Sequence, residues 1–112
     1  MSRDRQFLLD MLQSAELAVS YTAQCSKAEF ETNIQLQDSV IRRLLVIAEA
    51  ARRVSEATRQ TLPTVAWAEI NGMRNRLVHE YDAIDLNIVW DAIQTALPNL
   101  ITVLKSQISS EQ

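Results

Sequence analysis

The single histidine of the chain, His79, lies in a short polar stretch that could act on a phosphodiester. Arg74, Asn75 and Arg76 precede it within five positions. Cleavage of RNA without a metal needs a base for the ribose hydroxyl, a cation for the charge on the phosphorane, and an acid for the leaving oxygen. Histidine suits the proton transfers and arginine suits the phosphate. A lone histidine at a helix end is the simpler interpretation, and the spacing alone favours it.

The spacing within this stretch sets a geometric condition. Asn75 and His79 are four residues apart and share one face of a continuous helix. Arg74 and His79 are five residues apart, which places them about 140° around the axis of an ideal helix. These two side chains therefore converge only if the helix ends or tightens near Val78, or if a second copy of the chain supplies one of them.

The middle of the chain is basic, although the whole chain has a net charge of −3. Residues 42–76 contain seven arginines and three glutamates, whereas the flanking segments are both acidic. Arginine binds phosphate through a planar, permanently charged fork. We therefore expect Arg42, Arg43, Asn75 and Arg76 to hold an RNA substrate. A solvated helix face is the alternative interpretation of such a charge pattern.

The composition excludes several classes of function. A single glycine is incompatible with glycine-rich phosphate loops, and a single cysteine excludes an intrachain disulfide and a cysteine-built zinc site. With one histidine and scattered carboxylates, we expect neither a metal nor a cofactor. The longest uncharged stretch, Ala92 to Leu104, is too short to span a bilayer, and the N-terminus does not resemble a signal peptide. We therefore expect no membrane association and a cytoplasmic location.

Hydrophobic periodicity predicts four long helices in one domain spanning residues 1–112, an all-α up-and-down bundle. The expected helices cover residues 3–24, 33–58 and 64–78, and a last one begins near Asp85. Ser26 and Glu29 have the spacing of a capping box, and Thr64 could cap the third helix, with Ala66, Ile70, Met73 and Leu77 facing inward. The last helix carries one apolar stripe, interrupted at Pro98, where we expect a kink or a local break. The stripe comprises Leu86, Val89, Trp90, Ile93, Leu97, Leu100, Ile101, Leu104 and Ile108.

Residues 44–48 form an unbroken apolar run in the second helix. Five consecutive apolar residues surround the axis of a helix, so this helix must be covered on more than one side. In so small a protein, a second subunit is a plausible cover. Both this run and the offset between Arg74 and His79 would be explained by a homodimer with a cleft built from two chains.

The polar stretch resembles a family motif. Arg74-x4-His79-x-Tyr81 is similar to the R-x4-H-x-Y motif of the HepT-like toxins, which are members of the HEPN ribonuclease superfamily. The resemblance is strongest over residues 34–101. Further positions match in order and spacing: Arg42-Arg43-Leu44, Ile47-Ala48-Glu49-Ala50, Pro63, Trp67, Ile70, Met73, Asn75, Leu77-Val78, Ile84-Asp85, Val89-Trp90 and Leu97-Pro98-Leu100.

The resemblance implies a bundle of four to five helices that forms a homodimer, with two motifs facing across a cleft. It implies metal-independent ribonuclease activity that leaves a cyclic phosphate, with Arg74 and His79 as catalytic residues and Asn75 as their polar neighbour. It also implies a partner, a minimal nucleotidyltransferase antitoxin that can adenylylate Tyr81. Ala48 stands where the family often has glycine, a difference that concerns helix packing more than chemistry.

Two other functions remain open from the sequence. One is a non-catalytic HEPN dimer that binds RNA or a nucleotide, or that docks the nucleotidyltransferase. The other is a purely structural dimer. The intact pair of Arg74 and His79 favours cleavage over the non-catalytic dimer.

Overall fold

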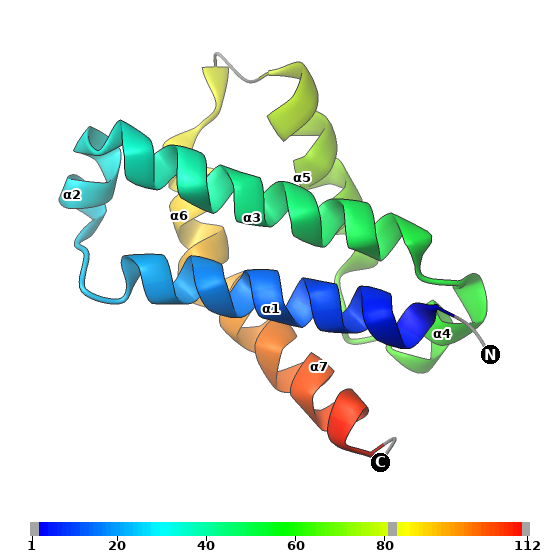
Figure 1. Ribbon diagram of the computed structural model, residues 1–112. Helices are drawn as coiled ribbons and strands as arrows, with labels where there is room; N and C mark the ends of the chain where they lie inside the picture. Colours follow the sequence, from blue (N-terminus) through cyan, green and yellow to red (C-terminus); the bar gives the residue numbers. More distant parts are fainter. Residues whose placement is uncertain (1–2, 81–82, 111–112) are drawn as a thin grey trace.

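A computed structural model describes residues 3–80 and 83–110, which form helices joined by short turns and contain no strand. This confirms the expected all-α bundle. Helices α1 and α3 pack side by side, α7 packs across α1, and α5 packs against α3 (Figure 1). The helices are α1 (Asp4–Thr22), α2 (Lys27–Thr32), α3 (Ile34–Arg53), α4 (Glu56–Thr61), α5 (Trp67–His79), α6 (Leu86–Asp91), the π-helical segment η2 (Ala92–Ala96) and α7 (Leu97–Ser110).

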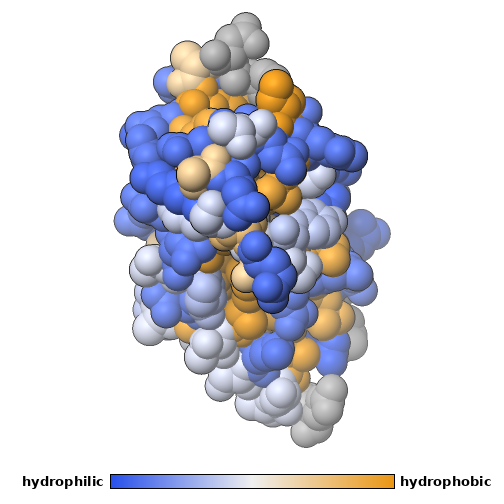
Figure 2. All heavy atoms as spheres, turned by 90° about the vertical axis from the view of Figure 1, so that its left-hand side faces the viewer, coloured by the Kyte–Doolittle hydropathy of each residue, from blue (hydrophilic) through white to orange (hydrophobic). Residues whose placement is uncertain are grey.

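The two short helices α2 and α4 lie at opposite ends of the long helix α3 (Figure 1). The surface at the α2 end is mostly hydrophilic, with smaller apolar areas between the polar side chains (Figure 2). Within the described residues, no helix combines the length and the apolar character that a membrane span requires.

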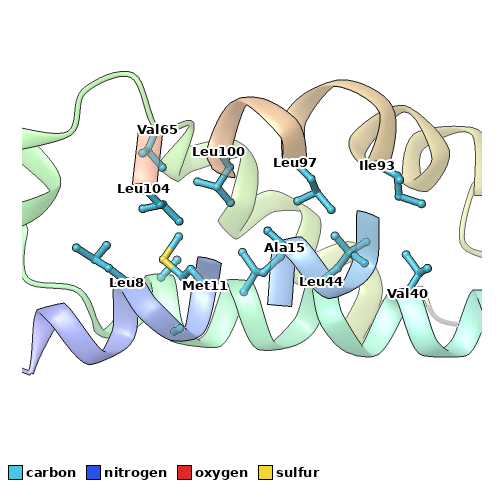
Figure 3. Close-up of a cluster of buried hydrophobic side chains, with 14 of the residues drawn as sticks. Leu8, Met11, Ala15, Val40, Leu44, Val65, Ile93, Leu97, Leu100 and Leu104 are labelled. Atoms are coloured by element: carbon cyan, nitrogen blue, oxygen red, sulfur yellow. The ribbon is translucent and has the colours of Figure 1, made fainter. Parts of the chain in front are cut away.

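The core lies where α1, α3 and α7 meet, and the apolar side chains of these helices point toward one another (Figure 3). Leu8 and Met11 of α1 and Leu104 of α7 are fully buried. Burial of one such side chain contributes about 1.5–3 kcal/mol. The apolar stripe predicted from Leu86 to Ile108 is confirmed, because each of its residues is buried or half-buried.

Two local predictions from the sequence are also confirmed. The capping box forms at the start of α2: Glu29 N donates to Ser26 Oγ over 3.1 Å, and Ser26 N donates to Glu29 Oε1 over 2.9 Å. These hydrogen bonds lower the pKa of the Glu29 carboxyl. The local break before Pro98 is the π-helical segment η2, after which Leu97 N donates to the carbonyl of Ala92.

The predicted helix over residues 33–58 begins as expected, with Asn33 as its N-cap, but its predicted end is wrong, because α3 ends at Arg53 and a separate helix α4 follows. Val54 adopts an extended backbone and is buried, and Ser55 caps α4. The carboxylate of Asp4 holds this break. It accepts hydrogen bonds from Ser55 N at 3.0 Å and from the hydroxyls of Ser55 and Thr58. Because Asp4 comes from α1, the helical pattern of this segment could not show the break.

The predicted cap at Thr64 is also wrong. Helix α5 begins three residues later, after Ala66, which makes no capping hydrogen bond with its side chain. The intervening turn is set by the carbonyl of Leu62, which accepts hydrogen bonds from Val65 N at 3.1 Å and from Trp67 Nε1 at 3.1 Å. Ala66 is exposed rather than inward-facing, whereas Leu77 is buried and Ile70 and Met73 are half-buried.

Candidate functional site

Arg74 is held in place by a carboxylate from another helix. Its Nε donates to Oε1 of Glu49 on α3 at 2.7 Å, and its Nη1 lies 3.4 Å from Oδ1 of Asn75. The Arg74 side chain is 23% exposed, so it is held against α3 but is still open to a ligand. This arrangement fixes the plane of the guanidinium while it leaves the second terminal nitrogen for a phosphate oxygen.

Glu49 lies among three arginines. Besides Arg74, it contacts Nη1 of Arg52 at 3.6 Å, and Arg53 adds a further attractive charge. The hydrogen bond from Arg74 is the main reason that the pKa of the Glu49 carboxyl is below its ordinary value; burial opposes this shift, and the charges of Arg74, Arg52 and Arg53 add to it. One carboxylate among three guanidiniums leaves this part of the α3–α5 surface positive, which suits a phosphate backbone.

His79 is the last residue of α5, and its side chain is exposed. The helix neither ends before it nor tightens, since Glu80 N still donates to the carbonyl of Arg76 at 2.9 Å. Arg74 and His79 are therefore five residues apart on a regular helix, about 140° around its axis. Asn75 is exposed one turn before His79. A single chain thus brings Asn75 and His79 to one face and directs Arg74 elsewhere.

The other three candidate arginines lie in different surroundings. Arg76 is exposed and lines a cavity of about 200 Å³ next to Glu80 and Asp85. Arg42 is exposed and lines a second cavity, of about 270 Å³, together with Glu49. Arg43 is half-buried, and its Nη1 donates to Ser14 Oγ of α1 at 3.3 Å. The structure therefore places Arg42 on the same cavity as Glu49, whereas Arg43 contacts α1.

The apolar run at residues 44–48 is largely covered by the chain itself. Leu44, Ile47 and Ala48 are buried, and Leu45 and Val46 are half-buried beside Phe7 of α1. This run therefore gives no independent argument for a second subunit. Ala48 is buried on α3 and lines the cavity between α3 and α5. Tyr81 lies outside the described residues.

Across residues 3–80 and 83–110, His, Cys, Asp and Glu side chains form no group of three or more that could hold a metal ion.

Comparison with known proteins shows which family the chain belongs to. The family model "Ribonuclease HepT-like" matches residues 11–106. The chain belongs to the HepT-like ribonuclease family. "Putative RNase MJ1380" of Methanocaldococcus jannaschii is 34% identical to it over 96 residues, which are 86% of this chain and 88% of that protein.

Two more relatives agree with this HepT-like assignment. "Putative RNase TTE0752" of Caldanaerobacter subterraneus subsp. tengcongensis is 30% identical over 112 residues, the full length of both chains. "Probable ribonuclease HepT" of Thermococcus cleftensis is 27% identical over 96 residues, which are 86% of this chain and 87% of that protein. No solved structure matches the chain.

Sequence reasoning on this HepT-like chain missed one residue of the candidate site, Glu49. Arg74 and His79 stand within one short stretch, so their spacing could be examined directly. Glu49 lies 25 residues before Arg74 and contacts it only because α5 packs against α3. The sequence signals it in two ways, as an acid within the arginine-rich segment and as one of the positions that match the family, but neither signal indicates its partner.

Proposed function

We propose that this HepT-like protein is a metal-independent endoribonuclease toxin that acts as a homodimer. The observation that carries the proposal is the ribonuclease family match over residues 11–106, which includes both Arg74 and His79. Both side chains belong to α5, and neither is buried. The proposal extends the family assignment to a mechanism, a toxic role and a partner.

The proposed reaction is attack of a ribose 2′ oxygen on the adjacent phosphorus, with loss of the 5′ oxygen of the next nucleotide and formation of a cyclic phosphate. His79 transfers protons in this reaction. Arg74 stabilises the negative charge that builds on the phosphorane, and Asn75 binds the hydroxyl or the phosphate. Arg42, Arg43 and Arg76 hold the flanking backbone. Glu49 acts as a positioning residue for Arg74.

A dimer would bring together the two catalytic side chains that a single chain holds apart. Leu77 is buried, whereas the other described residues of α5 are half-buried or exposed, so most of this helix is free to face a second copy. Arg74 and His79 diverge around the axis of one α5, so Arg74 of one copy would act with His79 of the other. This composite arrangement is one of the two that the sequence allowed, and the regular helix through His79 favours it over a tightened helix end.

The proposed antitoxin is a minimal nucleotidyltransferase that adenylylates Tyr81. Tyr81 follows His79 by two residues. AMP attached there would add a bulky base and a negative phosphate close to Arg74 and Arg76. The phosphate would compete for the same guanidiniums that bind the RNA backbone. Inhibition would then require no refolding of the toxin.

Expression of the chain alone tests the proposed function. The wild-type chain should arrest growth and fragment cellular RNA, and His79→Ala should do neither. In purified form, Arg74→Ala and His79→Ala should each lower the cleavage rate by a hundredfold or more, since loss of one charge-stabilising donor costs on the order of 10²–10³. Lys105→Ala is the matched control and should keep full activity, because Lys105 is an exposed cation of α7 that pairs with Glu16 of α1.

The metal dependence is measured in the same assay. Cleavage by the wild-type protein should persist in EDTA and should leave a cyclic phosphate on the product. Cleavage that required added magnesium or manganese would contradict the proposed mechanism, even if the product were cut RNA.

A further inference from the structure

A cavity of about 450 Å³ lies between α3, α4 and α5, beside the candidate site but distinct from its catalytic residues. Its volume is within the roughly 300–1,000 Å³ of small-molecule sites. Its lining combines small side chains with polar and aromatic ones. The residues are Ala48, Ala51 and Arg52 of α3, Arg59 of α4, and Trp67, Ala68, Ile70 and Asn71 of α5.

The polar groups of this cavity match the parts of a nucleotide. The described residues that line it include two arginines and no acid, so the lining favours an anion such as a phosphate. Trp67 is half-buried and offers an aromatic surface, on which a nucleobase can stack with a gain of about 1–3 kcal/mol. Asn71 is exposed and provides an amide that can pair with the edge of a base.

The side chain of Arg59 has a hydrogen-bond donor without a partner in the described part of the chain. Among the residues that the structure describes, its Nε is a buried side-chain nitrogen without a hydrogen-bond partner. The guanidinium is otherwise paired with Glu56, with Nη2 3.4 Å from Oε1 of that exposed carboxylate. A buried donor without a partner is unfavourable, and a movement of the Arg59 side chain, which is 35% exposed, toward an anionic oxygen in the cavity would give it one.

The break between α3 and α4 is what brings Arg59 to this cavity. A helix that continued past Arg53 would carry residue 59 further along the axis of α3. Instead, Asp4 holds Ser55 and Thr58, so α4 begins as a separate helix and Arg59 lies against the residues of α5. The same contacts fix the position of Arg59 in the absence of a ligand.

The cavity continues into the candidate site. Arg52 lies 3.6 Å from the same Glu49 oxygen that holds Arg74, so the two arginines flank one carboxylate. On α5, Asn71, Asn75 and His79 follow one another at intervals of four residues and are all exposed, so they form one polar stripe. A single RNA strand along this stripe would pass from the cavity to His79.

We propose that this cavity is a nucleotide subsite that binds one nucleotide of the RNA strand next to the scissile phosphate. Trp67 stacks on the base, Asn71 contacts the edge of the base, and Arg52 and Arg59 hold its phosphate. This inference rests on the proposed ribonuclease function and deepens it, because it assigns substrate binding to residues outside the R-x4-H motif.

The fluorescence of Trp67 reports directly on the subsite. Trp67 and Trp90 are the two tryptophans of the chain, and Trp90 packs on Phe30 with a centroid distance of 5.4 Å. In a Trp90→Phe, His79→Ala protein, titration with a short single-stranded RNA should quench Trp67. If Trp90→Phe does not fold, Trp67→Phe is used instead, and the quenching seen in the His79→Ala protein should then disappear.

Binding measurements test the charged part of the subsite. In the His79→Ala background, Arg59→Gln should raise the Kd for the RNA about tenfold, because it removes one charge-assisted hydrogen bond. Lys27→Gln is the matched control. It removes one exposed positive charge from α2, at the other end of α3, and should change the Kd by less than about twofold. Asn71→Ala should weaken binding of RNA without changing its dependence on salt, whereas Arg59→Gln should reduce that dependence.

Three outcomes would overturn the inference. Bound RNA that leaves Trp67 unquenched and is unaffected by Arg59→Gln would place the strand elsewhere. Free AMP that binds as tightly as the oligonucleotide would indicate a site for a free nucleotide rather than for a strand. Loss of nucleotidyltransferase binding in Arg59→Gln, with RNA binding unchanged, would make the cavity a protein contact.

The failure of the subsite differs from the failure of the proposed function. If the wild-type protein cleaves RNA, and Arg59→Gln and Asn71→Ala in the His79→Ala background bind RNA as tightly as their parent, the subsite is wrong and the ribonuclease proposal stands. If the protein binds RNA through Arg59 and Trp67 but never cleaves it, the subsite stands and the proposed catalysis is wrong.

Discussion

The hydrogen bond between Arg74 and Glu49 separates two roles within the candidate site. In the proposed mechanism Arg74 contacts the RNA phosphate, whereas Glu49 on α3 accepts a hydrogen bond from its Nε at 2.7 Å. Without this hydrogen bond the guanidinium would sample many rotamers, so it would stabilise the negative charge on the phosphorane less effectively. The arrangement therefore predicts a functional effect for a residue that does not itself touch the RNA.

Substitution of Glu49 tests its positioning role. Glu49→Ala should lower kcat on the order of tenfold to a hundredfold, because small misplacements of a catalytic group are costly, with a smaller effect on KM. Glu49→Gln keeps an oxygen acceptor for Arg74 and should retain more activity than Glu49→Ala. The control is Glu16→Ala on α1, which lies away from the site and should leave kcat unchanged. Equal activity of Glu49→Ala and the wild type would contradict the role.

The lowered pKa of Glu49 predicts how this effect depends on pH. A carboxyl whose pKa is depressed by folding contributes stability above its unfolded pKa, and this contribution is lost only as the pH falls through the lower, folded value. Glu49 therefore stays ionised throughout the neutral and mildly acidic range. The ratio of wild-type to Glu49→Gln cleavage rates should be the same at about pH 5.5 and pH 8. A ratio that falls toward the acidic end would show that Glu49 titrates there.

The catalytic candidates were accessible to sequence reasoning for a simple reason. Arg74, Asn75, Arg76 and His79 are close in the chain, so residue type and spacing were enough to single them out. Glu49 and Arg59 were not found, because their roles depend on contacts between helices. An acid or an arginine in a charged segment has many possible partners, and only the packing of α3, α4 and α5 selects one.

At the scale of the helices, the buried carboxylate of Asp4 determines where α3 stops and α4 starts. It accepts hydrogen bonds from the backbone and side chain of Ser55 and from the side chain of Thr58. Asp4 thereby joins the first turn of α1 to the first turn of α4. The helix that carries Arg59 is thus anchored by a residue about fifty positions earlier in the chain.

Removal of the Asp4 carboxylate should destabilise the fold. Asp4→Ala leaves the donors of Ser55 and Thr58 without their acceptor, which should lower the free energy of unfolding by about 1–3 kcal/mol. Urea denaturation followed by circular dichroism measures the change. Asp10→Ala, on the same helix, is the matched control, because Asp10 accepts one exposed hydrogen bond from Gln6. Equal destabilisation by the two substitutions would contradict the anchoring role of Asp4.

The sequence predicted most helices but not all of their ends. The capping box at Ser26 and the break before Pro98 depend on neighbouring residues, and both were predicted correctly. The end of α3 was missed because no glycine or proline marks it, and Val54 continues the apolar pattern. The start of α5 was missed because Thr64 is a good capping residue, although the contacts of Leu62 and Trp67 decide the turn.

At the scale of the whole molecule, α5 is a helix with much of its surface uncovered. It packs on α3, carries the motif and leads toward Tyr81. One copy of the chain therefore leaves much of α5, including Asn75 and His79, open to a second copy, to RNA and to an antitoxin. The proposed dimer and the proposed silencing by AMP both depend on this open face.

Modification of Tyr81 is tested by mass spectrometry. In protein expressed together with a nucleotidyltransferase encoded beside it, the peptide that contains Tyr81 should gain the mass of one or more AMP units. The gain should be absent in Tyr81→Phe, which should also stay toxic in the presence of the partner. A silenced wild-type toxin without any modification at Tyr81 would contradict the proposal and would indicate inhibition by steric binding.

The central claim is that Arg74 of one copy and His79 of the other form one metal-independent ribonuclease site. The most direct test is a heterodimer of Arg74→Ala and His79→Ala chains, purified through two different affinity tags and assayed for RNA cleavage in EDTA. Each parental homodimer should be inactive. The heterodimer has one intact composite site, so it should recover roughly half of the wild-type rate. A heterodimer as inactive as its two parents, beside an active wild-type control, would contradict the claim.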